Sequence, residues 1–143
     1  MTDAIYETLL ALDVGEQRIG VARARLDALF PQPLTTLENP ERFVEDIAAL
    51  CEAEKAAAIV VGLPRGLSGQ DTAQTAAVQE FGKRLESVLA IPVYWNDEAV
   101  TSVAAETELR GRGKPYTKAD IDALAAVYIL EDFLSEHPEY FHA

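Results

Sequence analysis

The sequence predicts an α/β fold in which a mixed five-stranded β-sheet is flanked by helices. Two adjacent segments, 8–14 and 18–24, have the patterns of two hairpin strands, and two later apolar runs, 59–63 and 92–95, alternate with helical patterns. A hairpin followed by strand–helix units combines antiparallel with parallel pairing. No internal repeat or shift in composition marks a boundary, so we expect residues 1–143 to form one domain.

The first three strands follow from residue patterning. Residues 8–14 are apolar on both faces, as in a central strand, and after a turn at 15–17 residues 18–24 alternate between polar and apolar. A third strand near 28–37 contains two prolines, which cannot donate to a sheet ladder. We therefore expect this third strand at an edge of the sheet.

Two helices and a buried strand come next. Asn39 and Pro40 predict a helix start, as N-cap and first helical residue, and apolar residues then recur at helical spacing as far as Cys51. The strand at 59–63 follows. A second helix is expected from Asp71 to about Leu89, with an apolar stripe of Ala73, Ala77, Phe81, Leu85 and Val88.

The last two helices follow the strand at 92–95. The third is indicated by Val100, Val103, Ala104 and Leu109. Thr117 caps the fourth, with Asp120 as the acid of a capping box. The packed core therefore runs from about residue 8 to 135, followed by a polar and aromatic tail at 136–143 that we expect to fray.

Composition excludes several functional classes. Apolar residues make up 49% and charged residues 25% of the chain, and no apolar run approaches a membrane span or a signal peptide. The single cysteine, Cys51, rules out an internal disulfide, and a cytoplasmic location is the default expectation. The net charge of −12 argues against a non-specific nucleic-acid coat protein but not against an enzyme that acts on nucleic acid, because local patches decide such binding.

Three carboxylates lie at the edges of predicted core elements. Asp13 ends the first strand, Glu98 follows the strand at 92–95, and Asp122 lies on the inward face of the last helix. Singly, each has a simpler interpretation, as a turn former, a helix-capping acid or a first-turn acid that complements the helix dipole. Ligands bind beyond the carboxyl ends of parallel strands, however, so the three can meet there. Hard divalent cations would relieve their mutual repulsion, and we expect one or two Mg²⁺ or Mn²⁺ ions, as in phosphodiester hydrolysis.

The remaining candidates are glycine-rich or basic. The segment 62–69 follows a buried strand, where backbone amides could meet phosphate, but it lacks the Lys-Ser/Thr ending of a P-loop. Arg18 and Arg65 either hold backbone phosphates or are solvated loop arginines. Four cations within nine residues form either a nucleic-acid-facing patch or a soluble loop, namely Arg110, Arg112, Lys114 and Lys118.

Four ordered segments resemble motifs of the YqgF (RuvX-like) family. They are Leu12–Ala22, Val60–Pro64 with Gly69, Asp97-Glu98 with Thr101, and Asp122 with Ala125-Ala126 and Ile129-Leu130, and the match spans about residues 9–134. The resemblance implies an RNase H-like fold and a metal-dependent nuclease. It also implies that Asp13, Glu98 and Asp122 are catalytic metal ligands, and that Arg18, Arg65 and Thr101 contact the substrate.

Three functional hypotheses follow. The first is an endonuclease that processes the 5′ end of pre-16S ribosomal RNA. In this hypothesis Arg110, Arg112 and Lys114 also hold the substrate. The family that the chain resembles is described as such a nuclease and also as a Holliday-junction resolvase, which acts on branched DNA. The second is a binding module of the same fold, because Ala99 replaces the family's arginine and removes a charge-assisted contact. The third is an ATPase of the actin-like type, which needs two such domains where this chain has room for one.

Overall fold

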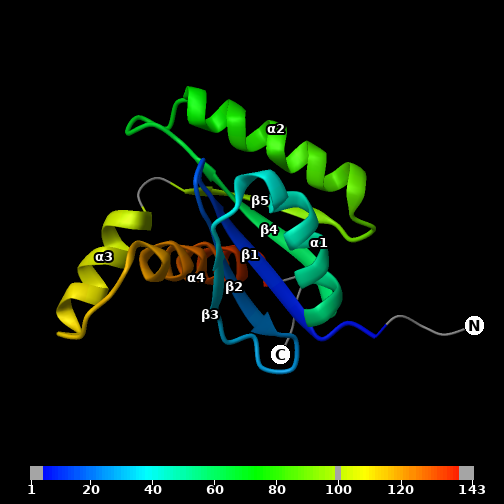
Figure 1. Cartoon of the computed structure of the whole chain (residues 1–143), viewed down its shortest axis with the longest axis horizontal. Helices are drawn as coiled ribbons and strands as arrows, with labels where there is room; N and C mark the ends of the chain where they lie inside the picture. Colours follow the sequence, from blue (N-terminus) through cyan, green and yellow to red (C-terminus); the bar gives the residue numbers. More distant parts are fainter. Residues whose placement is uncertain (1–4, 99–100, 139–143) are drawn as a thin grey trace, which may run out of the picture.

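The computed structural model describes residues 5–98 and 101–138, apart from the side chains of Glu98 and Thr101. These residues form a mixed sheet with helices on both faces (Figure 1). The strands are β1 (Thr8–Val14), β2 (Ile19–Arg25), β3 (Gln32–Leu37), β4 (Ala56–Pro64) and β5 (Val93–Glu98). The helices are the 3₁₀ turn η1 (Pro40–Arg42), α1 (Phe43–Glu54), α2 (Ala73–Val88), α3 (Thr101–Gly111) and α4 (Lys118–Glu136).

The sheet has the order β3-β2-β1-β4-β5. The pairs β1–β2 and β2–β3 are antiparallel, whereas β1–β4 and β4–β5 are parallel. The predicted five-stranded mixed sheet is therefore confirmed, and β3 lies at an edge, as its prolines require.

Two apolar layers hold the helices against the sheet. Leu9 and Ala11 of β1 face α4, which crosses one side of the sheet with α3 beside it, whereas Leu10 and Leu12 face α1 and α2 on the other side (Figure 1). All four side chains are fully buried. This explains why residues 8–14 are apolar on both faces, since β1 is the central strand of a sheet covered on both sides.

Helix starts are predicted correctly for α4 and incorrectly for α1 and α2. Thr117 and Asp120 form the expected capping box at the start of α4. The side chain of Asn39 makes no cap hydrogen bond, because the first turn is 3₁₀, and α1 begins only at Phe43. Helix α2 begins at Ala73 rather than Asp71, because Thr72 is its N-cap.

The apolar stripe predicted for α2 is also wrong in part. Leu85 is buried as predicted, but Val88 is 57% exposed, and the other buried positions of α2 are Thr75, Val78 and Gly82. Trp95 of β5 packs directly on Gly82, where a Cβ would come within 2.2 Å of the indole, so the side of α2 that carries Gly82 lies against the sheet. In α3, Val103 is 63% exposed, while Ala105 and Leu109 are buried against α4.

Strand β4 is longer than the predicted segment 59–63. Lys55 adopts a left-handed conformation with φ of 51° at the end of α1, so the chain reverses there and β4 begins at Ala56. Residues 139–143 of the predicted tail lie outside the described residues. No helix within residues 5–98 and 101–138 is long and apolar enough to cross a membrane.

Candidate active site

Asp13 and Asp122 come together because residue 20 has no side chain. Asp13 near the end of β1 is the register partner of Gly20 in β2, and directly paired residues face the same side of a sheet. The backbone of α4 lies directly over Gly20, where a Cβ would stand 1.9 Å from the carbonyl oxygen of Asp122. This close approach places the first turns of α4 next to the end of β1.

The carboxyl of Asp13 is strongly perturbed by this setting. Burial and then the nearby charge of Asp122 raise its pKa from 3.8 to about 6. Both causes disfavour the ionised form of Asp13, and a cation between the two groups would offset them by favouring that form. The prediction that these two carboxylates form one charged cluster is consistent with that coupling.

Arg18 is the counterion that Asp122 has in this structure. Its Nε donates to Oδ2 of Asp122 at 2.5 Å, and the two side chains are only 32% and 15% exposed. The turn between β1 and β2 sets this position, because the amide of Gly15 donates to the carbonyl of Arg18 at 2.9 Å. Arg18 is therefore directed into the carboxylate cluster rather than into solvent.

The third predicted ligand, Glu98, is described only by its main chain. It is the last residue of β5 and the register partner of Pro64 in β4, which in turn neighbours β1. The side chains of Glu98 and Thr101 lie outside the described residues. Among the side chains that are described, no three His, Cys, Asp or Glu residues form a cluster that could hold a metal.

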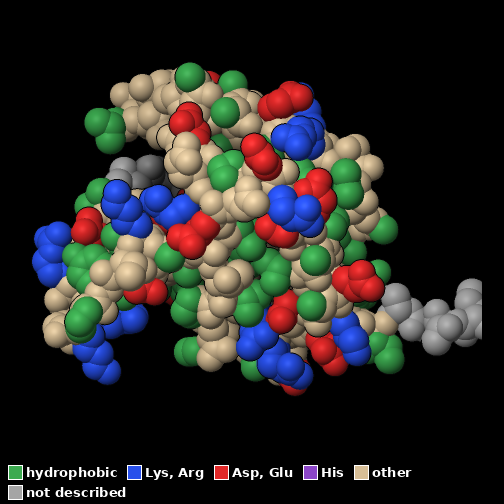
Figure 2. All heavy atoms as spheres, in the orientation of Figure 1, with side chains coloured by type: hydrophobic (Ala, Val, Ile, Leu, Met, Phe, Trp, Pro, Cys, Tyr) green, Lys and Arg blue, Asp and Glu red, His purple; other side chains and the backbone are tan. Residues whose placement is uncertain are grey.

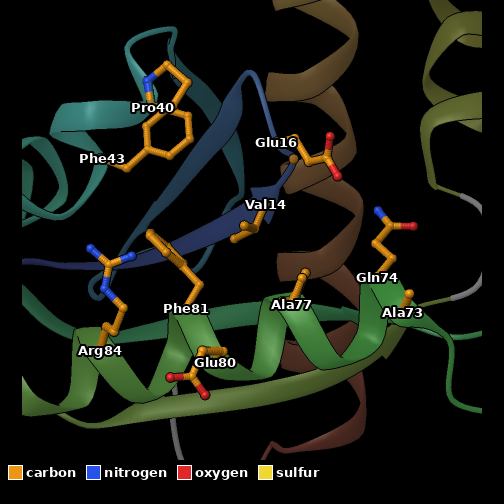
Figure 3. A pocket seen from close by; sticks show the side chains of 12 residues that line it. Val14, Glu16, Pro40, Phe43, Ala73, Gln74, Ala77, Glu80, Phe81 and Arg84 are labelled. Atoms are coloured by element: carbon orange, nitrogen blue, oxygen red, sulfur yellow. The ribbon is translucent and has the colours of Figure 1, made fainter.

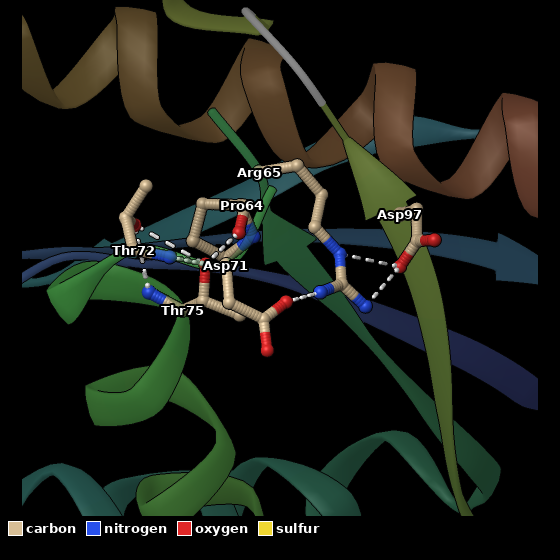
Figure 4. A network of polar contacts seen from close by, with 6 residues as sticks. All are labelled: Pro64, Arg65, Asp71, Thr72, Thr75 and Asp97. Carbon is tan, nitrogen blue, oxygen red and sulfur yellow. Dashed lines mark hydrogen bonds and ion pairs between the residues drawn. The ribbon is translucent and has the colours of Figure 1, made fainter. Parts of the chain in front are cut away.

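Arg65 joins the end of β4 to the end of β5 (Figure 4). It pairs with Asp71 and donates from Nε and a terminal nitrogen to Oδ1 of Asp97, each at 3.3 Å. Asp97 directly precedes Glu98. Beside this pair, the hydroxyl of Thr75 donates to the carbonyl of Pro64 at 2.5 Å. Arg65 therefore connects the loop after β4 to the strand that carries Glu98, and a role in binding substrate stays a prediction.

The glycine-containing loop after β4 does not present its amides for phosphate binding as the sequence suggested. The amide of Gly66 donates to the carbonyl of Gln70, and the amide of Gly69 donates to that of Gly66, each at 2.8 Å. The amide of Ser68 donates to the side chain of Gln70 at 2.9 Å. These three donors are used within the loop itself because it folds into tight turns.

The basic segment between α3 and α4 is only partly free. Arg110 pairs with Glu106 at 3.7 Å and Arg112 pairs with Glu108, each one turn along α3. Lys114 has no carboxylate partner among the described residues. Figure 2 shows Lys and Arg side chains gathered over α3 and the start of α4, at the left, with acidic side chains among them. Contacts of Arg110, Arg112 and Lys114 with a substrate stay predictions.

Lys118 is a candidate that the sequence named within the basic cluster but did not single out. It is the first residue of α4, four residues before Asp122, so both lie on one face of the helix. With Arg18 and Asp122 it lines a depression of about 270 Å³ between α3 and α4. The i,i+4 spacing to Asp122 was the signal that could have identified it.

A larger groove lies on the opposite side of the sheet, between α1 and α2 (Figure 3). It has a volume of about 490 Å³ and is lined by the turn after β1, by η1, and by the facing walls of α1 and α2. The rings of Phe43 and Phe81 point toward one another across it, with centroids 6.3 Å apart. None of the predicted site residues lines this groove, because Val14 points into it while Asp13 points to the other face.

Known proteins are similar to this chain over most of its length. A family model described as "RuvX: Holliday junction resolvase" matches residues 7–136. A protein of Chloroflexus aurantiacus named "Putative pre-16S rRNA nuclease" is 46% identical over 132 residues, which cover 90% of this chain and 86% of that protein. One of the same name from Crocosphaera subtropica is 39% identical over 89% of this chain and 92% of its own length.

Solved structures of resolvases share the fold. Thermus thermophilus RuvC, in complex with a Holliday junction substrate, matches with a TM-score of 0.59 at 15% identity, over 93% of this chain and 97% of that one. Fowlpox virus resolvase matches with a TM-score of 0.52 at 8% identity, over 90% and 97% of the two chains. The expected RNase H-like fold is thereby confirmed. With four motifs, a matching family model and close relatives in agreement, this chain belongs to the RuvX family of nucleases.

Proposed function

We propose that the protein is a divalent-metal-dependent endonuclease that processes the 5′ end of pre-16S ribosomal RNA. The observation that carries this proposal is the approach of Asp122 to Asp13 over Gly20, at a place where burial, and then the charge of Asp122, raises the pKa of Asp13 to about 6. Asp122 has Arg18 as its counterion, whereas no ion pair of Asp13 is formed among the described residues. A cation at Asp13 would therefore offset the cost of ionising this carboxyl beside a second one. The names of the relatives support RNA as the substrate, and such a role would place the protein in the cytoplasm.

The donor set fits Mg²⁺ or Mn²⁺. Carboxylate oxygens are the ligands that these hard ions prefer, and Asp13, Asp122 and Glu98 are the residues that would hold them. A bound divalent cation would supply charge neutralisation at the phosphate and a more acidic water molecule.

The protein's own residues would prepare the site for that chemistry. Asp13 must give up its proton for a cation to bind, and its pKa of about 6 makes this possible at neutral pH. Arg18 holds the carboxylate of Asp122 in place and keeps a positive charge at the site. Further contacts with the substrate backbone are proposed for Arg65, Thr101, Arg110, Arg112 and Lys114.

The test is cleavage of an RNA that spans the 5′ end of pre-16S RNA, with Mn²⁺ or with a chelator. We expect Asp13→Asn and Asp122→Asn to lose at least roughly 10- to 100-fold in rate, the loss that is typical when even a hydrogen-bonding partner of a metal ligand is removed. Asp132→Asn is the matched control, since Asp132 is an exposed acid on the same helix as Asp122. Equal rates for Asp13→Asn and the control would refute the assignment.

Cleavage of branched DNA is the second candidate, because the matching family model is described as a Holliday junction resolvase. The same variants should be assayed on a synthetic four-way junction. Metal-dependent cuts in the junction, with the RNA left intact, would favour this candidate over the first.

A further inference from the structure

A depression between α3 and α4 lies directly beside the carboxylate pair. Asp122 belongs to both the carboxylate pair and the depression, and its counterion Arg18 also lines the depression. Lys118 and Glu106 complete the charged lining. Both acids already have cationic partners. Asp122 is bound by Arg18 at 2.5 Å, and Glu106 lies 3.7 Å from Arg110 and accepts a hydrogen bond from Tyr116 at 3.1 Å. Among the side chains that the structure describes, the positive charge of Lys118 is therefore the one left unbalanced in this depression.

Such a cation is uncommon in this acidic chain. All 12 Lys and Arg residues lie within the described residues, and eight of them are within 4.0 Å of a carboxylate oxygen. The four without such a partner among the described side chains are Lys83, Arg84, Lys114 and Lys118. Lys83 and Arg84 belong to α2, on the other side of the sheet, and of the four only Lys118 lines the depression beside Asp122.

Electrostatics favours a polyanion at this place over others. The net charge of −12 repels a nucleic-acid strand from most of the surface. An unpaired lysine and a guanidinium that gives only its Nε to Asp122 offer several N–H donors on one side of the site. Phosphate contacts from Lys and Arg are what position a nucleic-acid strand on a protein.

We propose that this depression binds a phosphodiester group next to the one that is cleaved, with Lys118 as the anchoring cation and Arg18 as the second donor. The proposal rests on the proposed nuclease function. It sets the path of the strand, which runs over the junction of α3 and α4 and not over the apolar groove between α1 and α2.

Binding of a fluorescein-labelled RNA that spans the 5′ end of pre-16S RNA tests the proposal by fluorescence anisotropy over a series of salt concentrations. All measurements use an Asp13→Asn background, which prevents cleavage. Lys118→Glu is compared with Lys83→Glu, because both lysines are exposed and neither pairs with a carboxylate of the described part of the chain. Lys118 is the first residue of α4, where the helix dipole favours an acid, so its replacement by Glu should not reduce the melting temperature.

We expect Lys118→Glu to weaken binding by roughly 10-fold or more and to reduce the slope of log K against log salt by about 0.7, the value for one phosphate contact. Lys83→Glu should bind as its parent does. Equal affinities for the two variants would overturn the proposal, whether both are weakened or neither is.

The outcome is separable from that of the proposed function. Metal-dependent cleavage by the wild-type protein, together with unchanged binding by Lys118→Glu, would refute the phosphate site alone. Weakened binding by Lys118→Glu, without any metal-dependent cleavage by the wild-type protein, would refute the nuclease assignment alone.

Discussion

Replacement of Gly20 by Ala should disable the site while leaving every proposed ligand in the sequence. The new Cβ would lie 1.9 Å from the carbonyl oxygen of Asp122 and 2.8 Å from the amide nitrogen of Ala123, whereas ordinary contacts begin near 3.4 Å. The start of α4 must therefore retreat by about 1.5 Å, the difference between 3.4 and 1.9 Å. Overpacking of this kind costs about 1–3 kcal/mol, and a misplacement of about 1 Å at a reacting centre can reduce the rate by about 100-fold.

The assay pairs a thermal melt with the cleavage rate, measured well below the melting temperature so that all of the protein is folded. A loss of 1–3 kcal/mol corresponds to a fall of roughly 4–12 °C in a protein of this size. Gly111→Ala is the control, because a Cβ there has no heavy atom within 4 Å. Its melting temperature should not fall, because alanine is a better helix former than glycine, and its cleavage rate should be unchanged. If Gly20→Ala cleaves and melts as the control does, the contact over Gly20 does not position Asp122.

The remaining predictions concern Asp13 and the cap of α2. The pKa of Asp13 is about 6 in the folded protein against an ordinary value of 3.8, so ionisation of this carboxyl is harder in the folded state. The contribution of Asp13 to the stability of the metal-free protein therefore falls as pH rises from about 4 to 6, and it changes little above pH 6. In a chelator at pH 8, Asp13→Asn should therefore be more stable than wild type by up to about 3 kcal/mol in urea unfolding, and the gain should shrink toward pH 4; a gain that is independent of pH would contradict this. Added Mn²⁺ at about 100 times its Kd should stabilise wild type at pH 7.5 by about 2.7 kcal/mol, and a chelator should reverse this; an equal gain in Asp13→Asn would show that the ion binds elsewhere. Thr75→Val removes the donor to the Pro64 carbonyl and the acceptor for the Thr72 amide, so the free energy of unfolding in urea should fall by about 1–3 kcal/mol. The control Thr107→Val, at an exposed position, should change it by no more than about 0.5 kcal/mol. Equal effects of the two substitutions would refute the role of the cap.

Local patterns sufficed for much of the fold. The apolar run of 8–14 indicated a central strand, and Thr117 with Asp120 located the start of α4. These features depend on residues close together in the sequence, where spacing determines which side chains share a face. The start of α1 was missed because Asn39 and Pro40 suit both an α-helical and a 3₁₀ first turn, and the sequence does not distinguish the two.

Contacts between distant segments account for what the sequence could not predict. The inward position of Asp122 followed from helical spacing, but its place over Gly20 depends on how α4 docks on β2. Likewise, the sequence alone allows Arg65 to be a solvated loop cation, because its contact with Asp97 forms only when β4 and β5 pair. A glycine without a positive φ gives no local signal that another backbone touches it.

The central claim is that Asp13 and Asp122, with Glu98, hold a divalent cation. The most direct test is the anomalous difference map of a crystal grown with Mn²⁺ at pH 7.5. We predict a peak within about 2.0–2.3 Å of carboxylate oxygens of Asp13 and Asp122, the range of bonds from oxygen to ions of this kind. A map with no peak at this site, and with the pair between Arg18 and Asp122 intact, would contradict the claim.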